Sequence, residues 1–97
     1  MKFDIYPNPV DSYQAQKAKI KILINTNEIK SPLSVQVFDL LGREISRWHR
    51  SEIDSGGHYN LFQDSENHNS ASIVSGIYFV RVAVNSTVEH RKLVVLR

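Results

Sequence analysis

The chain closes with two apolar segments, SGIYFVRVAV from Ser75 to Val84 and VEHRKLVVL from Val88 to Leu96. Apolar residues alternate with other residues along these segments, a pattern typical of strands that bury one face. The Asn-Ser-Thr sequence at residues 85–87 favours a turn between them. The stretch therefore predicts a closing antiparallel hairpin of residues 76–84 and 88–96.

The same period continues towards the start of the chain. Ile20, Ile22 and Ile24 alternate with Lys19 and Lys21, so residues 19–24 are expected to form a strand with one apolar face. Residues 33–39, LSVQVFD, repeat the alternation. Both segments indicate half-buried strands.

A turn is expected at residues 40–43, LLGR, where Gly42 can supply a positive φ before residues 44–48 return as the next strand. The alternative is a helix across residues 40–53, because Leu41, Ile45 and Trp48 fall at helical spacing. A glycine inside that helix would cost ~1 kcal/mol relative to alanine, which favours the hairpin.

Prolines limit the first strand. Residues 3–6 are expected to be extended and to stop at Pro7 and Pro9, which have no amide proton, with Asn8 held extended by the proline after it. Residues 58–62 indicate a further strand, and the polar residues 63–72 indicate a surface loop. Seven short strands separated by turn signals predict an all-β fold, a seven-stranded antiparallel immunoglobulin-like β-sandwich.

Composition limits the class of protein. A chain of 97 residues fits one domain, residues 1–97 with a core at about 3–97, which we expect to be a monomer or weak dimer. With no cysteine, disulfides, a thiolate nucleophile and a zinc-thiolate site are excluded. A net charge of +2 does not argue for a nucleic-acid partner. No apolar run approaches the ~20 residues that span a bilayer, so no membrane span is expected.

Candidate catalytic and metal sites are weak. Asp64, Glu66 and His68 alternate and would share one side of an extended chain, yet ligands on a loop are not preorganised. The other histidines, His49, His58 and His90, lack metal-ligand spacing. We therefore expect no enzyme, no catalytic residue, no metal and no cofactor.

Arg43, Arg47, Trp48, His49 and Arg50 combine cations with an aromatic ring. Such a set suits stacking on sugars or single-stranded bases, and arginines that protect a strand edge explain the same residues. The second explanation is the simpler one. The end of the chain is also basic, through residues that include Arg81, Arg91, Lys92 and Arg97, for which a solvated strand face is the default interpretation.

Three sequence blocks, in a fixed order along the chain, resemble the motifs of a known protein family. They read YPNPV at residues 6–10, VFDLLGREI at residues 37–45 and SGIYFVRV at residues 75–82, and the basic KLVVLR follows at residues 92–97. With these blocks the chain resembles the C-terminal sorting domain, type A, of proteins exported by the type IX (Por) secretion system of Bacteroidetes-type bacteria. The resemblance covers almost the whole chain, and residues 64–72 depart from the family as an insertion.

The resemblance implies a set of recognition residues in the blocks and the basic last strand: Tyr6, Pro7, Asn8, Pro9, Asp39, Gly42, Arg43, Gly76, Tyr78, Arg81, Arg91, Lys92 and Arg97. It also implies a function. The domain would direct an upstream cargo domain through the periplasm to the outer-membrane type IX translocon and its shuttle components, and so to the cell surface or medium. A sortase-like signal peptidase commonly removes such a domain, and the cargo is joined to surface lipopolysaccharide.

The alternative is an immunoglobulin-like or fibronectin-like accessory module, either a spacer or a carbohydrate-binding module that uses Trp48 and the tyrosines as a sugar platform. Position separates the two, because a sorting domain is expected to end its precursor, and this sequence ends with its last strand at Arg97.

Overall fold

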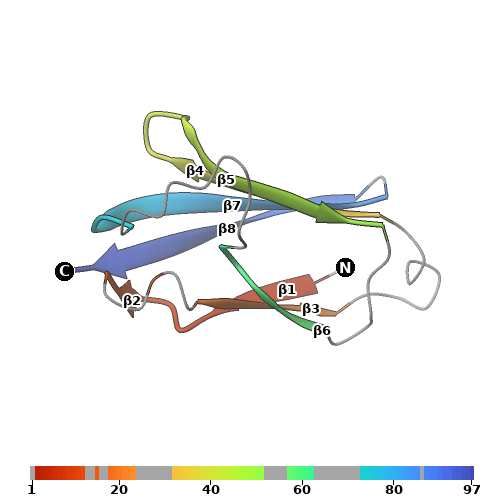
Figure 1. Ribbon diagram of the computed structural model, residues 1–97, viewed down its shortest axis with the longest axis horizontal. Helices are drawn as coiled ribbons and strands as arrows, with labels where there is room; N and C mark the ends of the chain where they lie inside the picture. Colours follow the sequence, from red (N-terminus) through yellow and green to blue (C-terminus); the bar gives the residue numbers. More distant parts are fainter. Residues whose placement is uncertain are drawn as a thin grey trace.

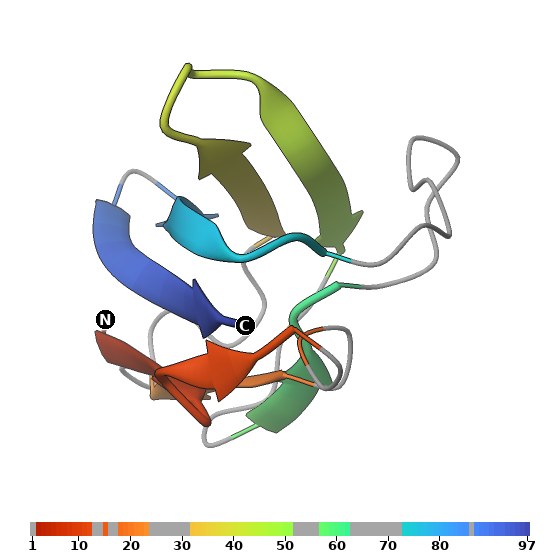
Figure 2. The same cartoon turned by 90° about the vertical axis from the view of Figure 1, so that its left-hand side faces the viewer.

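The computed structural model describes residues 2–12, 15, 18–23, 32–51, 57–62, 73–85 and 87–97. They form two packed β-sheets, and none of them belongs to a helix long and apolar enough to cross a membrane. Figures 1 and 2 show the two layers facing each other along their length.

The smaller sheet is antiparallel, with the strand order β1 (Lys2–Tyr6), β3 (Lys19–Leu23), β6 (Gly57–Asn60). The larger sheet has the order β2 (Val10–Asp11), β8 (Thr87–Leu96), β7 (Gly76–Val84), β4 (Leu33–Asp39), β5 (Glu44–Arg50). The predicted closing hairpin is β7 and β8, with Val84 opposite Thr87 across its turn. Asn85 in this turn takes a positive φ of 56°.

Alternation places one face of each sheet in the core. The smaller sheet buries Phe3, Ile5, Ile20 and Ile22. The larger sheet contributes alternate residues of four strands: Leu33, Val35, Val37, Trp48, Tyr78, Val80, Val82, Val84, Leu93 and Val95. Full burial of a side chain of this size is worth ~1.5–3 kcal/mol before the entropy of ordering is subtracted. The two apolar faces therefore supply a continuous core without cysteines.

The predicted strand count and purely antiparallel pairing are wrong, although the two-sheet sandwich is confirmed. The described residues form eight strands, because the chain adds β2 directly after the prolines. β2 runs parallel to β8, with Val10 opposite Val95 and Asp11 opposite Leu96. A strand of two residues is too short to show alternation, so no periodic pattern predicted it. The immunoglobulin-like topology is not confirmed.

Two boundaries also differ from the predictions. β5 continues to Arg50, which confirms the hairpin at residues 40–43 and rules out the helix across residues 40–53. β6 ends at Asn60, and Leu61 and Phe62 leave the sheet to enter the core. The Leu61 amide then donates to the Ala18 carbonyl at 2.9 Å. The predicted loop at residues 63–72, with Asp64, Glu66 and His68, lies outside the described residues.

Candidate recognition surface

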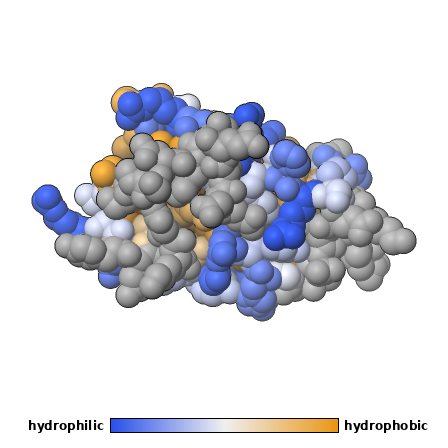
Figure 3. Space-filling model, viewed as in Figure 1, coloured by the Kyte–Doolittle hydropathy of each residue, from blue (hydrophilic) through white to orange (hydrophobic). Residues whose placement is uncertain are grey.

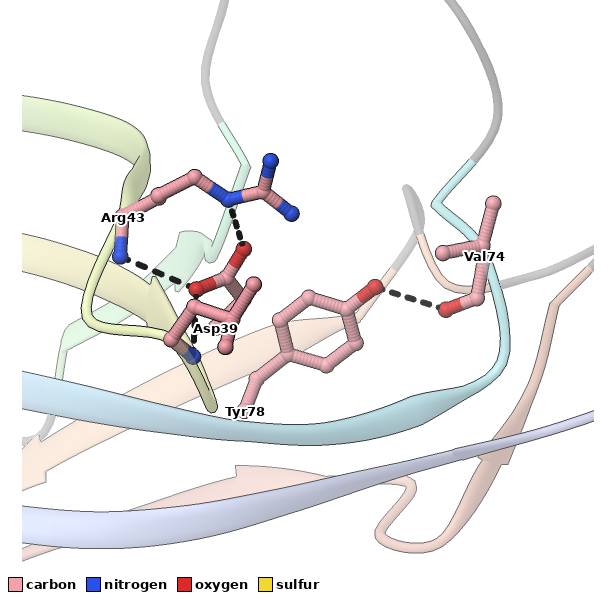
Figure 4. Close-up of polar contacts among 5 residues, drawn as sticks. Asp39, Arg43, Val74 and Tyr78 are labelled. Carbon is pink, nitrogen blue, oxygen red and sulfur yellow. Dashed lines mark hydrogen bonds and ion pairs between the residues drawn. The ribbon is translucent and has the colours of Figure 1, made fainter.

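The turn between β4 and β5 is held by one carboxylate (Figure 4). Oδ1 of Asp39 accepts hydrogen bonds from the backbone amides of Leu41 and Arg43, both at 2.9 Å, and Oδ2 accepts from Nε of Arg43 at 2.8 Å. Backbone bonds at 3.0 Å join the Gly42 amide to the Asp39 carbonyl and the Asp39 amide to the Arg43 carbonyl. Gly42 has a φ of +84°, as the sequence predicted. The turn is therefore fixed from within.

The same contacts set the charge of Asp39. Partial burial raises the pKa of its carboxyl, but the hydrogen bonds from Arg43 and Leu41 and the positive charge of Arg43 outweigh it, so the pKa lies below its usual value of 3.8. The carboxylate is thus ionised at neutral pH.

The tip of the turn is apolar and exposed. Because the backbone of the turn is fixed, the side chains of Leu40 and Leu41 project into solvent and are 64% and 78% exposed.

The start of β7 packs beside this turn. Tyr78 lies directly opposite Asp39 in the sheet, and its buried ring directs the hydroxyl away from the carboxylate, to donate to the Val74 carbonyl at 2.7 Å (Figure 4). Burial and the negative charge of Asp39 both raise the pKa of Tyr78 above 10.0. Gly76 has a φ of +153°, which side chains rarely adopt. The Tyr78 hydroxyl therefore ties Val74, which lies just ahead of β7, to the sheet.

Asn8 joins the first block to the last strand. Its Nδ2 donates to the Lys92 carbonyl at 2.8 Å, and its Oδ1 accepts from the Val94 amide at 3.1 Å. The side-chain amide thus pairs with the edge of β8 as a neighbouring strand would. Pro7 and Pro9 on either side both follow cis peptide bonds. β2 then continues the pairing, and the Ser12 amide donates to the Leu96 carbonyl at 2.6 Å.

Strand register brings the blocks to one end of the sandwich. Val95 of β8 lies between Val10 of the first block and Gly76 of the third, and Tyr78 of the third block lies opposite Asp39 of the second. In Figure 1 the β4–β5 turn, β2, the start of β7 and the end of β8 all lie towards the C label. We call residues 7–10, 39–43, 75–78 and 93–97 the motif end.

Three of the expected recognition residues lie elsewhere. Tyr6 is on the smaller sheet, where its hydroxyl is hydrogen-bonded to Nδ1 of His58. Arg81 lies in mid-sheet and donates to Oε1 of Gln36 at 2.9 Å. The guanidinium of Arg91 lies 5.2 Å from the ring centre of Phe3, so it spans the two sheets. Lys92 directly precedes the last segment of the motif end and Arg97 belongs to it, and both are exposed.

The alternative interpretation, in which Trp48 forms part of a sugar platform, is wrong. Its ring is 6% exposed, and its Nε1 donates to the Leu61 carbonyl at 2.8 Å inside the core. Arg50 stacks over Tyr59 at 5.0 Å from the ring centre instead. Arg47 lies on β5, at an edge of the larger sheet, as the edge interpretation predicted. Within the part of the chain that the structure describes, no three His, Asp or Glu side chains are grouped to hold a metal ion.

Fold and site together define a small β-sandwich module that presents a rigid, turn-rich end. A family model described as the secretion system C-terminal sorting domain matches residues 4–96, so the chain belongs to this family. The domain is the C-terminal secretion signal of a type IX secretion cargo protein, which is exported to the cell surface or secreted. The accessory-module alternative is not supported. A comparison with characterised proteins found no match.

Proposed function

We propose that the motif end is the surface by which the outer-membrane type IX translocon and its shuttle components recognise this domain. The observation that carries the proposal is the convergence of three remote blocks at this end, each fixed by hydrogen bonds or strand pairing. A receptor that binds a preformed surface does not bear the entropy cost of ordering it. The exposed Leu40 and Leu41 offer apolar contacts at its tip.

The position of the first strand supports this role. β1 begins at the end of the sandwich opposite the motif end (Figure 1), and the long axis of the molecule is 39 Å. A cargo domain joined ahead of β1 would therefore attach far from the motif end. One receptor could then read the same surface whatever cargo lies upstream.

The further steps of the proposal follow the family. The precursor passes through the periplasm, the translocon carries it across the outer membrane, and a sortase-like signal peptidase cuts ahead of this domain before the cargo is joined to lipopolysaccharide. In this scheme the domain is a substrate of the peptidase and performs no catalysis itself.

An export assay tests the proposal. We fuse the chain to the C-terminus of a periplasmic reporter in a bacterium with a type IX system and replace the turn side chains, Leu40→Ser with Leu41→Ser. Their side chains are not part of the core, so the fold should melt as before while surface delivery falls. Val88→Ser, 39% exposed at the other end of β8, is the matched control. Delivery at the wild-type level from the turn variant would contradict the proposal.

A further inference from the structure

Only alternate residues of the third block, residues 75–82, are buried in the core. Tyr78, Val80 and Val82 are buried in the core, whereas Ile77 and Phe79, which alternate with them, are 37% and 40% exposed on the opposite face of the sheet. Figure 2 shows that neither sheet formed by the described residues packs against this outer face. Large apolar side chains at these positions therefore contribute little to the core.

Neighbouring strands extend this exposed apolar surface. Phe38 lies opposite Phe79, and Ile77 lies opposite Val94, with Leu96 50% exposed two residues further on. We call Phe38, Ile77, Phe79, Val94 and Leu96 the apolar strip. Figure 3 shows hydrophobic surface mainly in the half of the molecule towards the motif end. A contiguous exposed apolar patch commonly marks an interaction site.

Cations lie beside the strip. Lys92 is directly opposite Phe79, and Arg81 is two residues along β7 on the same face. Among the described residues, neither cation has an ion pair. Two acids border this surface, Glu44 and Asp11. Oε1 of Glu44 forms an ion pair with Nε of Arg47 at 3.5 Å, and its Oε2 accepts a hydrogen bond from Nε2 of Gln36 at 2.9 Å. Asp11 lies opposite Leu96 in the sheet. The strip is therefore apolar at its centre, with cations along its β7 and β8 side and with Glu44, directly opposite Phe38, on its β5 side.

We infer that the apolar strip docks on a protein surface of the translocon that has an apolar centre bordered by carboxylates, with Arg81 and Lys92 pairing with those carboxylates. The inference rests on the proposed function and extends the motif end, which already includes Ile77, Val94 and Leu96, along the outer face of the larger sheet to Phe38 and Phe79. Complementary charge at an interface raises both specificity and the rate of encounter.

The charges beside the apolar strip disfavour two other binding partners, a second copy of the chain and a lipid surface. A second copy would bring the same Arg81 and Lys92 to the interface, and the carboxylate of its Glu44 is already paired with Arg47, so it offers them little complementary charge. Insertion into a lipid surface buries an apolar face ~5–10 Å deep. Lys92, in the same row as Phe79, would have to enter with it.

The test places a photo-crosslinking phenylalanine analogue at position 79 of the full precursor in cells that export it. We expect crosslinks to a translocon protein, identified by mass spectrometry. They should fall roughly tenfold when Arg81→Glu and Lys92→Glu are added, and remain with the charge-retaining pair Arg81→Lys and Lys92→Arg. Crosslinks to a second copy, to lipid or to nothing would overturn the inference.

Export of the reporter fusion gives the second readout. Ile77→Thr with Phe79→Thr keeps residues that suit a strand and should lower delivery roughly tenfold, whereas Val88→Thr on the same face should not. If the Leu40 and Leu41 variant is defective while the Ile77 and Phe79 variant is delivered normally, this inference fails and the proposed function stands. If both are delivered normally, the proposed function fails as well.

Discussion

Replacing Asn8 with alanine should loosen the last strand, because this one side chain joins the first block to β8. Nδ2 of Asn8 donates a hydrogen bond to the Lys92 carbonyl, and Oδ1 of Asn8 accepts one from the Val94 amide. A typical protein hydrogen bond contributes about 0.5–1.5 kcal/mol net of the water it replaces. Two such bonds give about 1–3 kcal/mol. Since Asn8 is exposed and water can reach both partners, we expect the lower end, about 1 kcal/mol.

Urea unfolding followed by fluorescence measures this loss. Trp48 is the single tryptophan and is buried, so its emission reports the loss of the core. With an m value of about 1–3 kcal/mol per molar urea for a small domain, a loss of about 1 kcal/mol moves the midpoint by about 0.3–1 M. Lys92→Ala is the matched control, because Asn8 bonds to the backbone carbonyl of Lys92 and not to its side chain.

The substitution Asn8→Asp tests whether the hydrogen bond that Asn8 donates contributes to stability. At neutral pH the carboxylate can still accept from Val94 but has no proton for the Lys92 carbonyl, so this variant should be at least as unstable as Asn8→Ala. Below a pH of about 3.9 the carboxyl is protonated and can donate again, so the difference from alanine should shrink or reverse. The reasoning is refuted if Asn8→Ala keeps the wild-type midpoint, or if Lys92→Ala shifts it equally.

Other substitutions test the turn, the core and the two shifted pKa values. Gly42→Val should lower the free energy of unfolding by about 1–3 kcal/mol because its φ is positive, and a thermal melt equal to that of the wild type would contradict this. Trp48→Phe leaves the Leu61 carbonyl without its donor and should cost about 1–3 kcal/mol in urea unfolding. The pKa of Tyr78 is raised on folding, so its contribution to stability is full below pH 10.0 and is lost as the pH rises through the higher folded value; Tyr78→Phe should reduce the loss of stability in alkaline melts. The pKa of Asp39 is lowered, so its contribution is full above pH 3.8 and is lost as the pH falls through the lower folded value; Asp39→Asn should flatten the acid side of the stability curve, and an unchanged acid limb would argue against the network.

Interactions between near neighbours were readable in the sequence. The turn at residues 40–43 is stabilised by Asp39 and Arg43, four positions apart, and by the positive φ of Gly42, so local residue types were enough to predict it. Alternation likewise predicted the longer strands and most of the core, but not β2, because a strand with one buried face carries that period wherever it pairs. The three blocks and their order indicated the family.

Local residue patterns were therefore enough to predict the all-β class, the β4–β5 turn, the closing hairpin and the sorting-domain family. Which distant segments meet depended on tertiary packing. The bonds of Asn8 cross 84 and 86 positions of the chain, β2 pairs parallel with β8, and Trp48 turns inward to Leu61. Alternation shows that a strand has two faces, but it does not show which strand lies alongside or which face is left outside. Those outcomes depend on how the two sheets pack, and they created both the motif end and the apolar strip.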